Sequence, residues 1–320
     1  MRQNCRLVRR GPDGPPGEAS AKQMHDACVS HWLDHGFGPY EWLPERGSFA
    51  CAATEDLVAK VWKPHRQRTT ADAAAAIDHS REKFLRGSHF APSIHLRWEA
   101  ISCLAGSGQP CNAAVVMRRL PFASRLDRLF ADLSSEKQPE SIELLFESHR
   151  RAVALLAPSD ASTELSLNRA DDRIMDQIDP QLEAGGQNLK RLWLELRAAR
   201  QPLMDEIRRR DRDGTCRQTH GDLAADNIYI DSGVVHWLDP CVTYPELYEV
   251  DSALDWAQLI VTLGSIQSRQ TSALIARGAR EAGISASLMS HYVARTALIR
   301  FTMRELSRNL SRRPAHSSFS

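Results

Sequence analysis

The sequence predicts an α+β protein in which a small β-rich lobe is followed by a large helical lobe. Between about residues 40 and 120, short apolar runs with strand character surround one helix. After residue 121, apolar residues recur at helical spacing, and one hairpin interrupts them. The 320 residues, of which 42% are hydrophobic, are enough for two lobes with sizeable cores. A ligand cleft is expected between the lobes.

The β-rich lobe is predicted from three segments. Residues 57–62 (LVAKVW) alternate between two faces, which is typical of a strand. Residues 71–85 are rich in alanine and indicate a helix, which Gly87 is expected to stop. Residues 113–117 (AAVVM) are a short apolar run that predicts a buried strand.

The helical lobe contains several predicted helices and the hairpin. Apolar residues recur at helical spacing from 142 to 156, and Pro158 ends the run. Residues 188–210 have the pattern of one charged, amphipathic helix, and further helices are marked at 250–261 and 294–301. Residues 228–230 and 234–238 are predicted strands, joined by the turn sequence Asp-Ser-Gly.

These signals divide the chain into four segments. Residues 1–25 are expected to be flexible, because positions 9–20 are rich in Pro and Gly. Residues 26–120 form the predicted N-lobe and residues 121–305 the C-lobe. Residues 306–320 are expected to be a flexible tail, since the apolar period is lost there.

Composition argues against several classes of protein. The chain has 41 Lys and Arg against 40 Asp and Glu, and a net charge of +1 is unlike that of a globally basic nucleic-acid binder. No stretch approaches the roughly 20 apolar residues of a membrane span, and the N-terminus lacks the apolar core of a secretory signal. The seven cysteines contain no CxxC pair. We therefore expect a cytoplasmic protein without nucleic-acid or membrane partners.

The stretch that carries chemistry is 220–239, HGDLAADNIYIDSGVVHWLD. Asn227 precedes the first strand of the predicted hairpin and Asp239 follows the second, so the two should converge. Asp222 lies on the loop leading in. Two carboxylates and an amide in one place are oxygen ligands suited to Mg²⁺ together with a base. Taken singly, each of the three is more often a turn former or a cap.

The spacing H-x-D-x-x-x-x-N, followed by a hairpin and a further Asp, is the arrangement of the catalytic and metal loops of protein kinases. HGDLAADN resembles the Brenner motif of aminoglycoside phosphotransferases and choline kinases, which have HGD where protein kinases have HRD. The segments RDRDGTCRQTHGDL, VVMRRLPFASRLDRLF and VDSALDWAQL are similar to a bacterial branch of aminoglycoside phosphotransferase family enzymes. The resemblance covers about residues 40–305 and implies the bilobal protein-kinase-like fold. No motif in it is specific for the acceptor.

The resemblance implies roles for the polar residues. Asp222 would accept or orient the proton of the acceptor hydroxyl, and Asn227 and Asp239 would hold Mg²⁺ on the phosphates of ATP or GTP. Lys60, in a run that resembles the lysine strand of kinases, would contact the α- and β-phosphates, steered by Glu82 on the following helix. Without the motif, Lys60 could be a surface lysine and Glu82 an exposed helix residue.

Further nucleotide contacts are expected from two loops. The loop with Gly47 and Ser48 would cover the phosphates, although it lacks G-x-G-x-x-G. A linker between the lobes would bind adenine through its backbone; it contains Met117, Arg118 and Arg119.

The motif departs from the family pattern after its catalytic residues. Ala224 stands where the branch often has His, and Pro240 follows Asp239, which makes a swinging activation segment less favourable. Asp255 is expected to anchor the catalytic loop, with a simple helix N-terminal acid as the alternative. His220 is expected to support the loop and not to act as a base.

The sequence thus predicts an ATP- or GTP- and Mg²⁺-dependent phosphotransferase that acts on a hydroxyl. The acceptor is open between a small aminoglycoside-like molecule and a Ser or Thr of a peptide, as in modified-peptide biosynthesis with a partner enzyme. A polycation could bind acids of the 158–185 region, namely Asp160, Glu164, Asp171, Asp172, Asp176 and Asp179. An acidic leader peptide could bind the arginines at 118, 119, 125 and 128. Either set could instead be solvated. The alternative from another class is a catalytically weak pseudokinase that binds nucleotide or serves as a scaffold.

Overall fold

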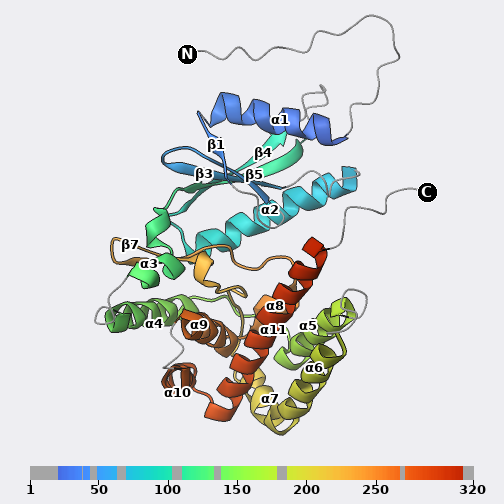
Figure 1. The fold of residues 1–320 in the computed structure, drawn as a ribbon, viewed down its shortest axis with the longest axis vertical. Helices are drawn as coiled ribbons and strands as arrows, with labels where there is room; N and C mark the ends of the chain where they lie inside the picture. Colours follow the sequence, from blue (N-terminus) through green and yellow to red (C-terminus); the bar gives the residue numbers. More distant parts are fainter. Residues whose placement is uncertain are drawn as a thin grey trace, which may run out of the picture. The chain divides into compact units, whose positions relative to one another are not determined.

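The structure, a computed structural model, describes residues 21–37, 39–43, 49–62, 70–102, 110–132, 138–178, 186–266 and 271–312 (Figure 1). They divide into two compact units. The small unit contains the described residues up to Arg81 together with Arg97–Met117. The large unit contains Glu82–Leu96 and the described residues from Arg118 onward. The architecture is therefore α+β, with strands concentrated in the small unit and helices in the large one.

The small unit is built on a five-stranded sheet with the order β1-β2-β3-β5-β4. Its strands are β1 (Glu41–Trp42), β2 (Phe49–Ala53), β3 (Leu57–Trp62), β4 (His95–Ser102) and β5 (Pro110–Arg118). Helix α1 (Ala21–Gly36) lies along the sheet, and Leu33 packs with Val61 and Val116 in the core of this unit (Figure 1). The alternation predicted for β3 is confirmed, because Ala59 and Val61 are buried whereas Lys60 is half-buried.

Helix α2 (Thr70–Phe90) begins in the small unit and ends in the large one. The prediction that Gly87 stops this helix is wrong, because the helix continues to Phe90. Gly87 is instead a site of close approach. A Cβ atom at this position would overlap the ring of His95, so the absent side chain lets β4 start against the helix.

The large unit is mainly helical, with two short two-stranded sheets. Its helices are α3 (Leu126–Asp132), α4 (Gln138–Ala154), α5 (Thr163–Ile178), α6 (Gly186–Arg200), α7 (Met204–Arg212), α8 (Pro245–Tyr248), α9 (Ala253–Ile266), α10 (Thr271–Ala282) and α11 (Ala286–Arg312). Strand β6 (Cys216–Gln218) pairs with β9 (Glu249–Asp251), and β7 (Ile228–Asp231) pairs with β8 (Val234–Trp237). Figure 1 shows α11 between the α9–α10 pair and the α5–α6 pair. The main core gathers Phe146, Trp256 and Met289.

The single helix predicted over 188–210 is two helices. Helix α6 ends at Arg200, a 3₁₀ turn covers Gln201–Leu203, and α7 begins at Met204. Pro202 lies in the turn, where its missing N–H and its ring interrupt the helical hydrogen bonds. Helix α7 after the break carries Arg210, which contacts Asp251.

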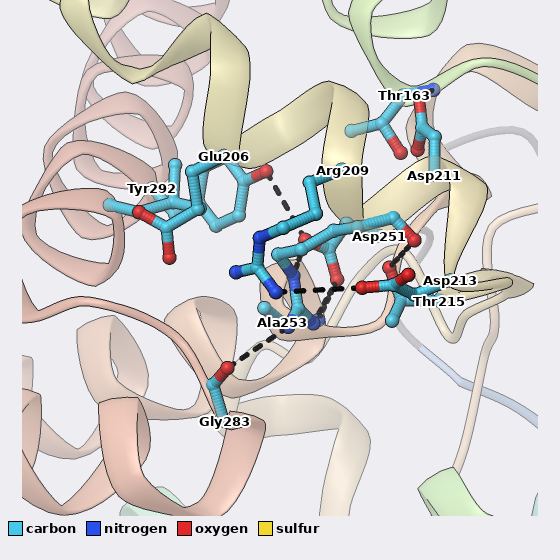
Figure 2. A network of polar contacts seen from close by, with 12 residues as sticks. Thr163, Glu206, Arg209, Asp211, Asp213, Thr215, Asp251, Ala253, Gly283 and Tyr292 are labelled. Atoms are coloured by element: carbon cyan, nitrogen blue, oxygen red, sulfur yellow. Dashed lines mark hydrogen bonds and ion pairs between the residues drawn. The ribbon is translucent and has the colours of Figure 1, made fainter.

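A buried ion pair joins α7 to the entry of α9. Arg210 donates from Nε to Asp251 Oδ2 (2.6 Å) and from Nη2 to Oδ1 (2.8 Å). Asp251 also accepts a bond from the N–H of Ala253 (3.0 Å), and Arg210 donates to the carbonyl of Gly283 (3.2 Å). Figure 2 shows Asp251 with Ala253, Gly283 and Tyr292 around it. This bidentate pair fixes β9 and α9, which carry the supports of the candidate site.

Candidate functional site

The hairpin β7–β8 places Asn227 beside Asp239. Ile228 is opposite Trp237, and the N–H of Leu238 donates to the carbonyl of Asn227 (2.7 Å), so the strand ends meet as the sequence predicts. The turn has positive φ at Ser232 (52°) and Gly233 (76°), which matches the right-handed twist of the two strands. Asp239 has a φ of 60°, a left-handed conformation that is uncommon for a residue with a side chain.

Asp222 and Asn227 are joined directly. The Nδ2 group of Asn227 donates to the backbone carbonyl of Asp222 (3.1 Å) and to its carboxyl Oδ2 (3.2 Å). The amide nitrogen is thereby directed at Asp222, which leaves Oδ1 as the atom of Asn227 that could bind a cation. Loss of solvation raises the pKa of the Asp222 carboxyl, and the nearby charges of Arg300 and Lys83 act in the opposite direction. This carboxyl therefore takes up a proton more readily than an ordinary Asp.

Asp255 holds the loop that carries Asp222. Its Oδ2 accepts the N–H of His220 (2.8 Å), and its Oδ1 accepts the N–H of Gly221 (3.2 Å). The expected anchoring role of Asp255 is thus confirmed by its contacts. Burial raises the pKa of Asp255 to about 6, although the two N–H donors favour its charged form. Gly221 has a φ of 76° at this point, and a Cβ there would come within 2.9 Å of the Cys241 side chain.

His220 is a support of the loop. Its side chain is fully buried, burial lowers its pKa to about 3, and the ring is therefore neutral. The N–H of Asp222 donates to Nδ1 (3.3 Å), and Phe90 packs edge-on against the ring with the centroids 4.9 Å apart. The expectation that His220 is not a base agrees with this placement.

Two residues of α2 contact the site, and sequence reasoning missed both. Lys83 Nζ lies 3.6 Å from Asp239 Oδ1 and donates to the carbonyl of Pro240 (2.7 Å). Arg86 is buried, donates to the carbonyls of Thr219 and Cys241, and stacks 3.9 Å from the ring centre of Tyr248. The cue available in the sequence was the basic spacing of positions 83 and 86 on one helix face, next to the residue that the kinase resemblance selected.

The predicted nucleotide residues lie on several elements. Lys60 is on β3 opposite Cys51, and Glu82 is half-buried on α2. These two residues belong to different units, so their pairing stays a prediction. Gly47 and Ser48 lie outside the described residues.

The predicted linker begins at the end of β5. Met117 is buried, Arg118 Nη2 lies 3.3 Å from Asp231 Oδ2, and Arg119 is half-buried. In the same segment Arg125 forms two bonds to Asp127, at 2.6 and 2.7 Å. Arg128 Nε also lies 3.9 Å from Asp127 Oδ2, so three of the four clustered arginines are near an acid.

A small cavity of about 70 Å³ opens beside Asp222, within the large unit. Gly221 and Asp222 line it from the catalytic loop, Gln258 from α9, and Arg295 and Arg300 from α11. The backbone of Leu223 is tied to the same helices: its N–H donates to Gln258 Oε1 (2.8 Å), and its carbonyl accepts from Arg300 Nη2 (2.7 Å) and from the Thr262 hydroxyl. The cavity wall and the catalytic loop are thus one connected structure.

The acids of the 158–185 region are mostly paired with arginines. Asp171 is buried against Arg200 and Arg295, with distances of 3.0 and 2.9 Å. Glu164 pairs with Arg208 (2.9 Å) and Asp172 with Arg197 (2.8 Å). Asp160 and Asp176 are exposed, and Asp179 lies outside the described residues.

The described residues also bear on metal binding and on membrane spans. Within the described ranges, no group of three or more His, Cys, Asp or Glu side chains could hold a metal ion. A magnesium ion in a phosphotransferase is commonly held by one or two protein ligands plus substrate phosphates, so the pair Asn227 and Asp239 fits such an ion. No helix in the described part of the chain is long and apolar enough to cross a membrane.

Comparison with known proteins bears on the fold. No protein-family model matches the sequence, and no curated protein matches it. Among solved structures, an aminoglycoside-3'-phosphotransferase of type VIII is similar over 86% of this chain and 98% of that chain, with 18% identity and a TM-score of 0.52. The GDP complex of an aminoglycoside 2'-phosphotransferase-IIIa is similar over 91% and 96% (14% identity, TM-score 0.48). A choline/ethanolamine kinase family protein from Mesorhizobium loti is similar over 90% and 98% (15% identity, TM-score 0.42). The first likeness shows that the chain has the protein-kinase-like fold of the aminoglycoside phosphotransferases.

Proposed function

We propose that this chain is an ATP- or GTP- and Mg²⁺-dependent phosphotransferase that moves the terminal phosphoryl group of the nucleotide to a hydroxyl of its acceptor. The observation that carries the proposal is the bond from Asn227 Nδ2 to the Asp222 carboxyl (3.2 Å), with Asp239 beside Asn227 at the end of the hairpin. In this proposal Asp222 would be the base and Asn227 and Asp239 the oxygen ligands of a cation, on a fold like that of a known phosphotransferase.

The reaction needs no protein nucleophile. The acceptor oxygen forms a bond to the terminal phosphorus while the bond from that phosphorus to the bridging oxygen breaks, and the nucleoside diphosphate leaves with the electron pair. The proton of the acceptor hydroxyl passes to Asp222 and then to solvent. The raised pKa of Asp222 favours this transfer, and Asn227 orients its carboxyl.

Asn227 Oδ1 and the Asp239 carboxyl would hold Mg²⁺. When bound, the ion supplies positive charge against the phosphate oxygens. Lys83 already places an ammonium group near Asp239, so the carboxyl stands in a positive environment. Lys60, Glu82, the loop with Gly47 and Ser48, and the linker from Met117 to Arg119 remain the proposed nucleotide contacts.

Thermal unfolding with and without Mg²⁺ and ATP tests nucleotide binding. A ligand that binds only the folded protein stabilises it by about 2.7 kcal/mol at a hundredfold excess over its dissociation constant. We expect a Mg²⁺-dependent rise in the unfolding temperature of the wild type, and its loss in Asp239→Asn. Asp226→Asn removes the same charge from the exposed neighbour of Asn227 and should keep the rise. An unchanged rise in Asp239→Asn would refute the metal role.

Turnover tests the role of Asp222. Asp222→Asn should lower phosphoryl transfer by about 10²- to 10⁴-fold while nucleotide binding persists, because general base catalysis is lost. Full turnover in this variant would remove Asp222 from the mechanism. A wild-type protein that binds Mg²⁺ and ATP but never consumes ATP, with or without acceptors, would favour the pseudokinase alternative.

A further inference from the structure

The cavity beside Asp222 is the place where an acceptor must present its hydroxyl if the proposed function holds. Its volume of about 70 Å³ corresponds to about five to seven water molecules, on the basis of about 10–15 Å³ for each. That is room for a single small head group next to the hydroxyl, and not for an entire antibiotic. The chemistry of its walls therefore indicates which head group fits.

Arg300 supplies positive charge to this cavity without a carboxylate partner. Its guanidinium donates to the Thr262 hydroxyl (2.7 Å) and to the carbonyl of Leu223 (2.7 Å), and both of these acceptors are neutral. Among the described residues, no acid lies within ion-pair distance of it. Burial lowers the pKa of Arg300, and the negative charges of Asp222 and Asp226 oppose that shift. A guanidinium has five N–H donors, so donors remain for a ligand.

Arg295 adds a second guanidinium, five residues earlier on α11 and almost fully buried. Its Nε donates to Asp171 Oδ1 (2.9 Å), whereas its Nη2, although 2.9 Å from the same oxygen, makes no hydrogen bond within the described residues. Asp171 is also shared with Arg200 at 3.0 Å. One carboxylate therefore faces more than one guanidinium, and the positive charge at this wall is not fully compensated.

Each acidic side chain that lines the cavity already has an ion-pair partner or a proposed role. Glu246 is buried and accepts a bond from Arg173 Nε (2.6 Å). Asp222 is the proposed base. A cationic head group would therefore meet Arg295 and Arg300 with no spare carboxylate on the described part of the lining. An anion would meet two donors of the residue type that binds carboxylate and phosphate best.

We infer that the acceptor carries an anionic group, a carboxylate or a phosphate, which binds in this cavity against Arg300 and Arg295 while the hydroxyl faces Asp222. This inference rests on the proposed function and narrows its substrate class. It separates this chain from a kinase for polycationic antibiotics, because the arginine-lined wall repels ammonium groups. Three of the four acids of α5 that could have bound a polycation, Glu164, Asp171 and Asp172, are instead paired with arginines.

A matched series of three-carbon alcohols tests the charge preference. Glycerate carries a carboxylate, glycerol 3-phosphate a phosphate, glycerol no charge, and serinol an ammonium group. Calorimetric titration of the wild type should show glycerate or glycerol 3-phosphate binding at least about tenfold more tightly than glycerol, since bonds to charged groups add about 1.5–3 kcal/mol. Whichever anion binds better identifies the head group. Tighter binding of serinol or kanamycin, or no binding of either anion, would overturn the inference.

Gln258→Glu is the sharpest variant for this test. The change is isosteric, and a carboxyl oxygen can still accept the N–H of Leu223, so the catalytic loop keeps its support. The added negative charge should weaken binding of the preferred anion by about tenfold or more and improve binding of serinol. Arg208→Gln changes the net charge by the same amount through a residue that pairs with Glu164, away from the cavity lining, and should leave both affinities unchanged. Equal anion affinity in Gln258→Glu and the wild type would place the anion elsewhere.

Nucleotide binding, measured on the same samples, separates the two proposals. A protein that binds and consumes Mg²⁺ and ATP but prefers glycerol or serinol keeps the proposed function and loses the anionic acceptor. A protein that binds an anion in a manner sensitive to Gln258→Glu, but never binds Mg²⁺ and ATP, keeps the anion site and loses the phosphotransferase function.

Discussion

Asp251 and Asp255 are two buried carboxylates four residues apart, and they have different structural roles. The Asp251 carboxylate accepts hydrogen bonds from the guanidinium of Arg210 on both of its oxygens, at 2.6 and 2.8 Å. Asp255 meets backbone N–H groups, those of His220 at 2.8 Å and Gly221 at 3.2 Å. The first residue joins secondary-structure elements, and the second orients the loop that carries Asp222.

The partners explain why the roles differ. A full positive charge compensates the burial of Asp251, so removing either partner leaves a buried charge alone. Two N–H dipoles compensate Asp255 only in part, and its raised pKa of about 6 reflects this. We therefore expect changes at Asp251 to unfold the protein and changes at Asp255 to act first on the site.

The largest expected effect is on stability. Asp251→Ala leaves Arg210 buried without its partner and should lower the free energy of unfolding by about 3–5 kcal/mol. Arg209→Ala is the control, since Arg209 lies beside the same network but pairs with Asp213 on the surface at 3.5 Å (Figure 2). An exposed pair contributes at most about 1 kcal/mol. Similar losses in the two variants, measured by denaturant unfolding, would contradict the anchoring role of Asp251.

The family resemblance indicates Asp255 as the anchor of the catalytic loop, but the residues themselves do not reveal the role of Asp251, for a physical reason. Both fall in VDSALDWA at a predicted helix start, where either could be a simple N-terminal acid. What distinguishes them is Arg210, 41 residues earlier in the chain than Asp251. Arg210 lies on α7, a separate helix that the amphipathic pattern over 188–210 merges with α6.

The hairpin and the motif were more predictable, because their contacts are local. Asn227 lies opposite Leu238, the residue before Asp239, through a two-residue turn, and such pairing follows from sequence spacing. Lys83, Arg86 and Arg300 contact the same loops from helices far away in the sequence. The basic spacing of positions 83 and 86 is the one cue to these partners, and no motif marks Arg300, so the charge of the cavity could not be predicted.

The second-largest expected effect is on turnover, and it tests the role of Asp255. In Asp255→Asn, the side-chain oxygen can still accept one of the two loop N–H groups. The side-chain NH₂ group is a donor and cannot accept the second N–H. We expect the loop to shift and phosphoryl transfer to fall by about a hundredfold, because small displacements of a catalytic group have effects of that size. The folded fraction should stay above that of Asp251→Ala. Unchanged turnover in Asp255→Asn would show that the backbone alone positions Asp222.

The pH dependence of the free energy of unfolding further distinguishes Asp255 from Asp251. The pKa of Asp255 is about 6 in the folded protein and 3.8 in the ordinary reference, so its protonated form favours folding. That contribution is complete below the unfolded pKa and is lost as the pH rises through about 6. Between about pH 4.5 and about pH 7.5, the wild type should lose about 2 kcal/mol from this group.

Variants isolate this effect from other groups that titrate in the same range. The stability difference between wild type and Asp255→Asn should shrink by about 2 kcal/mol from low to high pH. Asp251→Ala keeps Asp255, so its difference from wild type should vary less. Denaturant unfolding across this range measures both. A constant difference for Asp255→Asn would contradict the raised pKa.

The smallest expected effect is a gain in stability, and it lies in the hairpin between the two loops of the site. Ser232 holds a left-handed conformation with a φ of 52°, followed by Gly233 at 76°. Asn is favoured at the first position of such a turn, so Ser232→Asn should raise the free energy of unfolding by a few tenths to about 1 kcal/mol. Val234→Asn is the control, because it adds the same side chain on the exposed start of β8. Ser232→Asn should leave turnover unchanged, together with the pH dependence of stability that Asp255 causes. The residues that support the catalytic loop, His220 and Asp255, do not contact the turn. A loss of turnover would show that Asn227 and Asp239 are positioned by the turn as well as by Asp255, and the division between fold anchor and loop support would then be too simple.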